Sequence, residues 1–168
     1  MRTALLMALL FGMVQGLWAG GFSYRELCSL LGDLRGWQAE ECTGMDLESP
    51  QGRMVMASRE YRCKERVLQV TAVTGSSAMA YWSNWASFKP GTTLNTPEQL
   101  LKMIQVEGFP VGIVQSKRGK EGVIVVLLGK GEKAPGVLQA SFRGLDWEEA
   151  IEALKGLPWK DMERRMRQ

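Results

Sequence analysis

The stretch VGIVQSKRGKEGVIVVLL, residues 111–128, decides the fold that this chain is expected to adopt. Val111–Ser116 and Val123–Leu128 are rich in β-branched and aliphatic residues, whereas residues 117–122 between them are polar and contain two glycines. This pattern predicts two antiparallel strands joined by a short turn. Val123–Leu128 consists of six consecutive aliphatic residues, which predicts a central strand buried on both faces.

Other strands are predicted on both sides of this hairpin, separated by turn residues. They are Trp37–Met45, Arg53–Cys63, Arg66–Thr74 and Val137–Phe142. Long helical crossovers between successive strands are missing, which disfavours a doubly wound parallel sheet. The expected fold class is therefore α+β, with a single antiparallel β-sheet of about six strands and helices packed on it.

Helices are predicted where a capping box precedes an apolar pattern. The three boxes are Ser23–Glu26, Thr96–Gln99 and Asp146–Glu149. A further helix is expected over Ala78–Phe88, and a terminal helix is expected to begin near Trp159. In the Ala78–Phe88 segment the helical spacing places Tyr81, Trp85 and Phe88 on one core-facing stripe. Trp82 lies off that stripe and is expected at the surface.

Composition limits the chemistry that the chain can perform. The chain has 168 residues, enough for one domain, and its formal net charge of +3 does not indicate nucleic-acid binding. It contains no histidine, which excludes Ser-His-Asp and Cys-His nucleophile pairs and histidine metal sites. Residues 129–134 match a nucleotide-binding glycine pattern, but Pro135 and Gly136 follow directly and favour a hairpin turn. No catalytic residue, metal site or cofactor is therefore expected.

The first nineteen residues have the pattern of a secretory signal peptide. Arg2 precedes an apolar run over residues 4–14, and small residues follow, so cleavage is expected after Gly16 or Ala19. Residues 20–168 would then form one α+β domain, periplasmic or secreted, with no stable membrane span after cleavage. The alternative is an uncleaved N-terminal anchor or a first buried helix.

Three cysteines, Cys28, Cys42 and Cys63, lie in the expected exported chain. An oxidising compartment would allow one disulfide and leave one thiol. A turn at Ser49–Gly52 would place Cys42 opposite about Ala57, so a Cys42–Cys63 bond would need a different register. Pairing of Cys28 with either of the others is at least as compatible with the sequence.

Arg59, Tyr61 and Trp82 are the candidate residues for binding a ligand or partner. Arg59 and Tyr61 project from the same strand face as Val55 and Ala57, and a guanidinium on a partly apolar face needs a partner. That partner is either a group on a ligand or a carboxylate of this chain, in which case Arg59 is a structural ion pair with a packed stem. Trp82 is a candidate because aromatic side chains often anchor interfaces.

Several short segments resemble one family. They are Gly36-Trp37, Ala57–Tyr61, Val67–Val73, Val106–Val111 and the end from Phe142–Leu145 to Trp159. Together they resemble bacterial exported (periplasmic) proteins with a PsbP/Mog1-like fold. The resemblance implies an antiparallel sheet flanked by helices and an accessory or binding role. It carries no catalytic residues over to this chain.

These observations predict an exported envelope protein that acts as a non-enzymatic binding or accessory module. The expected partner is an envelope protein or an apolar ligand, and no nucleic acid. The alternatives are a carrier of an apolar small molecule or lipid, a purely structural component, and a carboxylate-dependent hydrolase. A deep pocket around Arg59 and Tyr61 would favour ligand binding or catalysis, whereas a filled core with shallow grooves would favour an interaction protein.

Overall fold

The computed structural model describes residues 22–75, 77–129 and 135–167. The predicted signal peptide, residues 1–19, lies outside the described residues. The same holds for residues 130–134, which make up most of the glycine-rich segment discussed above. No helix in the described part of the chain is long and apolar enough to cross a membrane.

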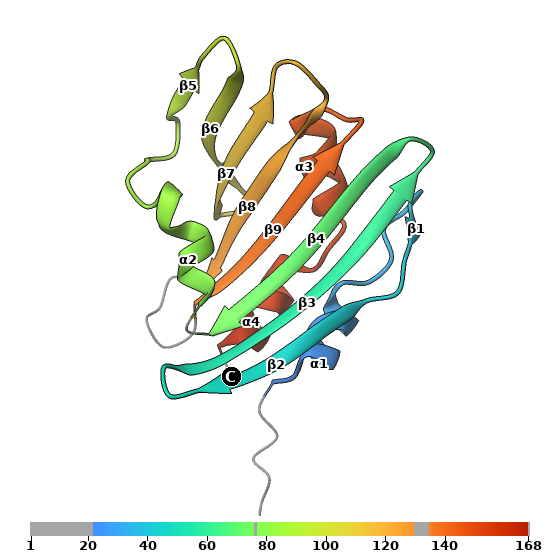
Figure 1. The fold of residues 1–168 in the computed structure, drawn as a ribbon, viewed down its shortest axis with the longest axis vertical. Helices are drawn as coiled ribbons and strands as arrows, with labels where there is room; N and C mark the ends of the chain where they lie inside the picture. Colours follow the sequence, from blue (N-terminus) through green and yellow to red (C-terminus); the bar gives the residue numbers. More distant parts are fainter. Residues whose placement is uncertain (1–21, 76, 130–134, 168) are drawn as a thin grey trace, which may run out of the picture.

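The described residues form an α+β fold around one antiparallel sheet of nine strands (Figure 1). The strands are β1 (Gln38–Ala39), β2 (Thr43–Ser49), β3 (Gly52–Cys63), β4 (Arg66–Gly75), β5 (Thr93–Asn95), β6 (Gln99–Val106), β7 (Phe109–Ser116), β8 (Glu121–Gly129) and β9 (Gly136–Arg143). The predicted fold class is confirmed, but the expectation of about six strands is too low.

The sheet is built from two meanders that meet at its centre. Its order is β1-β3-β4-β9-β8-β7-β6-β5, and β2 also pairs with β3. The first meander is β2-β3-β4 and the second runs from β5 to β9. Antiparallel pairing of β4 with β9 joins them, with Val70 opposite Ala140. The aliphatic strand β8 lies between β7 and β9, as its unbroken apolar run predicted.

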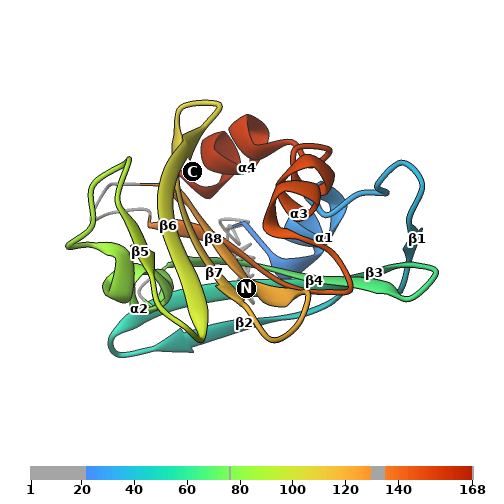
Figure 2. The same cartoon turned by 90° about the horizontal axis from the view of Figure 1, so that it is seen from above.

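Helices α1 (Tyr24–Leu30), α3 (Trp147–Leu154) and α4 (Trp159–Met166) gather on one side of the sheet (Figure 2). Alternate residues of the strands face them and form the larger of two hydrophobic clusters. From the central strands these residues are Leu68, Val70, Ala72, Ile124, Val126, Leu128, Leu138, Ala140 and Phe142. We call this the covered face. Both predicted capping boxes of this layer, at Ser23 and Asp146, are present.

The opposite face is covered at one end only. There α2 (Ala78–Trp82) and the short 3-10 helix η1 (Ser83–Trp85) pack a second cluster against Val73, Val125, Leu127 and Val137. Trp85 lies on Gly112 of β7, where a Cβ atom would stand 2.2 Å from the indole ring. The glycine therefore makes room for the tryptophan, a contact that the sequence pattern did not reveal.

The prediction that Trp82 lies at the surface is wrong. Its side chain is 5% exposed, and its ring centroid lies 6.5 Å from that of Trp85. The expected helix over Ala78–Phe88 ends at Trp82 and continues as a 3-10 turn. In such a turn residues three apart eclipse each other, so Trp82 and Trp85 reach the same side.

A second correction concerns the segment after Thr96, which was expected to be a short helix. The Thr96 hydroxyl accepts hydrogen bonds from the backbone N–H groups of Glu98 (3.3 Å) and Gln99 (3.1 Å), as a helix cap would. The chain then continues as strand β6, which pairs with β7 over its whole length. The same local hydrogen bonds serve a turn here, because pairing within the sheet decides the conformation of the residues that follow.

Candidate functional site

The uncovered end of the sheet carries the main candidate site, a hollow that we call the sheet groove. It lies on the face opposite α1, α3 and α4, at the end of the sheet away from α2, and its volume is about 660 Å³. Most of its lining residues come from β3, β4, β6, β7, β8 and β9, and Glu98 and Arg118 come from the connections. They are Glu60, Val67, Gln69, Glu98, Gln99, Val114, Ser116, Arg118, Glu121, Gly122, Val123, Ser141, Phe142 and Arg143.

The lining of the sheet groove combines apolar and charged side chains. Three half-buried valines, Val67, Val114 and Val123, come from strands β4, β7 and β8. Glu98, Glu121 and Glu60 contribute carboxylates, and Arg118 and Arg143 contribute guanidinium groups. Apolar side chains combined with polar and charged ones are found in sites that bind protein surfaces. The groove is open rather than enclosed, so it does not resemble a buried pocket for a small apolar molecule.

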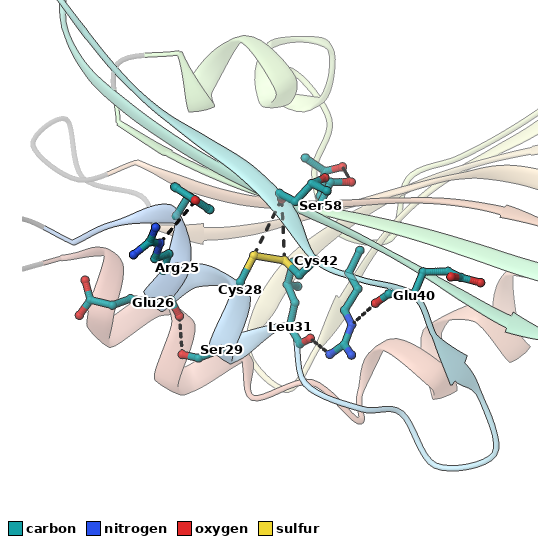
Figure 3. Close-up of a disulfide and its surroundings, with 12 residues drawn as sticks. Arg25, Glu26, Cys28, Ser29, Leu31, Glu40, Cys42 and Ser58 are labelled. Atoms are coloured by element: carbon teal, nitrogen blue, oxygen red, sulfur yellow. Dashed lines mark hydrogen bonds between the residues drawn. A yellow bond between two sulfur atoms is a disulfide. The ribbon is translucent and has the colours of Figure 1, made fainter.

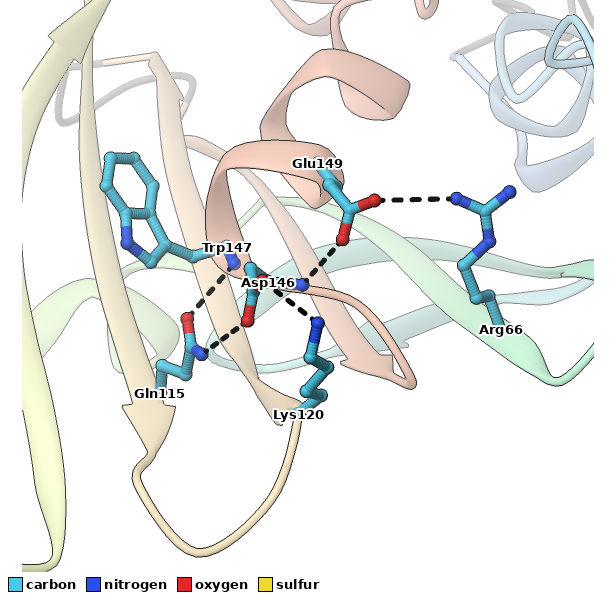
Figure 4. A network of polar contacts seen from close by, with 6 residues as sticks. All are labelled: Arg66, Gln115, Lys120, Asp146, Trp147 and Glu149. Carbon is cyan, nitrogen blue, oxygen red and sulfur yellow. Dashed lines mark hydrogen bonds and ion pairs between the residues drawn. The ribbon is translucent and has the colours of Figure 1, made fainter.

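A polar network on the covered side holds the β7–β8 hairpin that borders the groove (Figure 4). Asp146, which caps α3, accepts a hydrogen bond from Gln115 Nε2 (3.3 Å). It also forms an ion pair with Lys120 Nζ (3.2 Å). Gln115 Oε1 in turn accepts from the backbone N–H of Trp147 (3.0 Å). These contacts hold Gln115 and Lys120 on α3, and Arg118, which lies between them in the chain, lines the groove.

Arg59 and Tyr61 do not line the sheet groove, because they point to the covered face. The Arg59 guanidinium donates to the backbone oxygens of Leu31 (2.7 Å) and Glu40 (2.8 Å), and it pairs with Asp33 at 3.1 Å. Arg59 therefore satisfies its charge with groups of this chain and joins β3 to the segment after α1. These contacts match the alternative stated above, in which Arg59 forms a structural ion pair with a carboxylate of this chain.

Tyr61 is fully buried beside Arg59, and its hydroxyl donates to the backbone oxygen of Gly32 at 2.9 Å. Burial raises the pKa of this phenol to about 12, although the nearby Arg59 guanidinium acts in the opposite direction. Burial disfavours the phenolate because the charged form loses its hydration. The phenol therefore stays protonated in the folded chain and keeps its hydrogen bond to Gly32.

Cys28 and Cys42 form a disulfide with an S–S distance of 2.06 Å, which joins α1 to the start of β2 (Figure 3). Cys63, at the end of β3, is a free cysteine. The expected arrangement of one disulfide and one thiol is thus present, with Cys28 as one partner. The β2–β3 register expected from the sequence differs by two residues from the observed one, because Ala57 lies opposite Gly44 and not opposite Cys42.

The described residues contain no cluster of side chains that could bind a metal ion. Within residues 22–75, 77–129 and 135–167, no group of three or more cysteine, aspartate or glutamate side chains is arranged to hold a metal ion.

The sheet groove itself was missed from the sequence, since its residues are spread over six strands and the connections between them. One signal was present in β9: polar and apolar residues alternate over residues 139–143, at the groove end, whereas residues 136–138 at the other end contain no polar side chain.

The comparisons with known proteins do not identify a family. No family model matches the chain, and no curated protein matches it. Among solved structures, a GTP-binding regulator from Thermotoga maritima is similar at a TM-score of 0.38 and 12% identity, over 88% of this chain and 91% of that one. A similarity of this size supports no inference about fold or function. The resemblance to PsbP/Mog1-like exported proteins stays a prediction.

Proposed function

We propose that the protein is a non-enzymatic binding or accessory module of the cell envelope, and that it holds part of a partner protein in the sheet groove. One observation carries the proposal: the end of one sheet face away from α2 carries no helix among the described residues, and it forms a groove lined by three valines together with charged side chains. Surplus apolar side chains on an otherwise solvated sheet face are a feature of interaction sites.

Export is part of this proposal. It is supported by the order of charged, apolar and small residues at the N-terminus and by the Cys28–Cys42 disulfide. An open groove supports a protein partner more than a lipid, because a carrier of apolar molecules needs a cavity that removes most of the ligand surface from water.

The test is affinity purification from an envelope extract of cells that produce the protein, followed by mass spectrometry of the proteins and lipids recovered. The informative variant is Ser141→Arg, which introduces a long charged side chain into the groove from β9, a strand that lies between β4 and β8. The matched control is Ser29→Arg on the exposed surface of α1. We expect Ser141→Arg to lower recovery of a specific partner by about tenfold or more, the effect of losing a central interface contact.

The two variants separate the hypotheses. If Ser141→Arg and the wild-type protein recover the same partner in equal amounts, the groove is not the binding site. If the wild-type protein recovers a lipid or an apolar metabolite and no protein, the molecule is a carrier. The Ser29→Arg control should behave as wild type in either case.

A further inference from the structure

A second candidate interaction surface lies at the edge of the sheet, on strand β2. This strand pairs with β3 on one side only, and all seven of its residues are exposed. Every second backbone N–H and C=O group of an edge strand points away from its neighbour. Among the described residues, the backbone of residues 44–49 has no hydrogen-bonding partner outside β3. The edge is therefore a template on which another strand can pair.

The two faces of β2 differ in chemistry. Met45 and Leu47, each 48% exposed, project to the face that also carries Met54 and Met56 of β3, which stand opposite them. These four residues form an apolar strip that reaches the open edge. Asp46 and Glu48 project to the other face by strand alternation, on the side where α1 lies.

Charge is also distributed unevenly along this edge. Residues 36–52 contain four carboxylates, Glu40, Glu41, Asp46 and Glu48, and no lysine or arginine, although the whole chain carries a net charge of +3. Natural edge strands are commonly protected by lysine, proline or a bulge. On β2 itself both charges, Asp46 and Glu48, are negative and lie on one face, and the other face is apolar. Asp46 also accepts a hydrogen bond from the backbone N–H of Tyr24 (2.9 Å), and Glu48 lies opposite Arg53 of β3.

We infer that β2 pairs with an extended segment of another protein in which apolar residues alternate with lysine or arginine. The partner's backbone would continue the sheet, its apolar side chains would extend the strip of Met45 and Leu47, and its cations would meet Asp46 and Glu48. This surface is distinct from the sheet groove, because no residue of β2 lines the groove.

A second copy of this chain is a poorer occupant of the same edge. When two identical edges pair about a two-fold axis, equivalent faces come together, so the carboxylates of both copies would meet on one face. Like charges placed opposite each other destabilise strand pairing. The acidic face of β2 therefore disfavours self-association and favours a basic partner.

The test uses fluorescence anisotropy with the full chain and a labelled peptide of alternating valine and lysine, as long as β2 at 7 residues. A peptide of alternating valine and glutamate is the control for charge. We expect the valine–lysine peptide to bind, and its affinity to fall as salt is added, because exposed ion pairs are screened. The glutamate peptide should bind at least about tenfold more weakly.

Two protein variants locate the peptide. Leu47→Lys adds an edge lysine to β2 and should weaken binding by about tenfold or more. Leu94→Lys makes the same change on β5, the strand at the other end of the sheet, where Leu94 is 50% exposed, and should leave binding unchanged. Amide signals of β2 should shift in nuclear magnetic resonance spectra when the peptide is added, and those of β5 should not.

Three results would overturn the inference. The first is equal binding of the two peptides, and the second is equal weakening by Leu47→Lys and Leu94→Lys. The third is a dimer of the protein alone that Leu47→Lys converts to a monomer, because the occupant would then be a second copy. None of these results bears on the sheet groove, so this inference and the proposed function fail independently.

Discussion

Strand β9 presents different residues to the two faces of the sheet. Leu138, Ala140 and Phe142 point to the covered face, and all are buried under the helices. On the opposite face Val137 is buried near α2, but Ser141 is only half-buried and lines the sheet groove. The covered face is apolar along the whole strand, whereas the opposite face changes from apolar to polar at the boundary of the α2 cover.

This comparison teaches how helix cover can be inferred from the sequence of a strand. Where both faces are covered, as at the α2 end of β8, the residues form a continuous apolar run. Where only one face is covered, polar and apolar residues alternate. The valines that remain on the polar side of the groove, Val67, Val114 and Val123, depart from this alternation and mark the candidate site.

The largest effect is expected from a charge placed on either face of the same strand. Ala140→Asp buries a carboxylate in the covered face without a partner and should destabilise the fold by more than about 4 kcal/mol. Ser141→Asp, one residue further on, should change stability by less than about 1 kcal/mol because water reaches the groove. Urea unfolding followed by tryptophan fluorescence measures both.

If Ala140→Asp is not recovered folded, a milder pair of variants on the same strand replaces it. Leu138→Ala should then cost about 2–5 kcal/mol, and Gln139→Ala should cost less than about 0.5 kcal/mol. Equal costs for the two members of either pair would contradict the assignment of the faces.

The next largest effect concerns the disulfide that fixes α1 to the covered side. Replacing Cys28 and Cys42 with serine should lower the free energy of unfolding by about 3 kcal/mol, the value typical for a loop of this length. Chemical denaturation with and without a reductant tests this. Cys63→Ser is the matched control, and the reductant should destabilise this variant as much as it destabilises the wild-type protein. A double variant as stable as the oxidised wild type would show that the bond does not form.

A smaller effect is expected at the α2-covered end of the opposite face. Gly112→Ala would place a methyl group where the Trp85 ring lies and should cost about 1–3 kcal/mol. Gly119→Ala, in the β7–β8 hairpin, meets no atom closer than 3.8 Å and should be nearly neutral. Thermal unfolding compares the two. A neutral Gly112→Ala would mean that Trp85 does not pack against β7 there.

The last prediction is a pH dependence of stability that arises from Tyr61 on the covered face. The folded-state pKa of Tyr61, about 12, lies above its ordinary value of 10.0. Between these two pH values the unfolded chain has lost the phenol proton and the folded chain has kept it, so the stability from Tyr61 is present below pH 10 and is lost as pH rises toward 12. The slope is at most about 1.4 kcal/mol per pH unit. Urea unfolding of wild type and Tyr61→Phe between pH 9 and pH 12 should show this component only in wild type, and equal slopes would contradict it.

The sequence predicted the elements whose signals are local. The capping boxes at Ser23 and Asp146 and the aliphatic strand β8 were all recognised, because their patterns lie within a few residues. The capping pattern at Thr96 was misread as the start of a helix, since the same hydrogen bonds also serve a turn before a strand. Trp82 was misplaced because a helical wheel assumes an α-helix where the chain forms a 3-10 turn.

The sheet groove was beyond sequence analysis for a different reason. Its residues become neighbours only through the joining of the two meanders at β4 and β9, a pairing of segments about seventy residues apart that no local pattern encodes. Arg59 and Tyr61 were predicted as candidates for binding a ligand or partner, with a carboxylate of this chain as the alternative partner of Arg59. Arg59 does pair with Asp33, but the other groups that these two side chains contact are the backbone oxygens of Leu31, Gly32 and Glu40, which no sequence motif marks.

The most direct test of the groove as the binding surface is site-specific photo-crosslinking in cells that produce the protein. A photoreactive amino acid would replace Gln69 or Ser141 in the groove, Leu47 on the β2 edge, or Ser29 on the exterior of α1. The account predicts one discrete adduct from both groove positions and none of that mass from Ser29. An adduct that forms equally from Ser29, or no adduct from either groove position while the protein is folded, would contradict it.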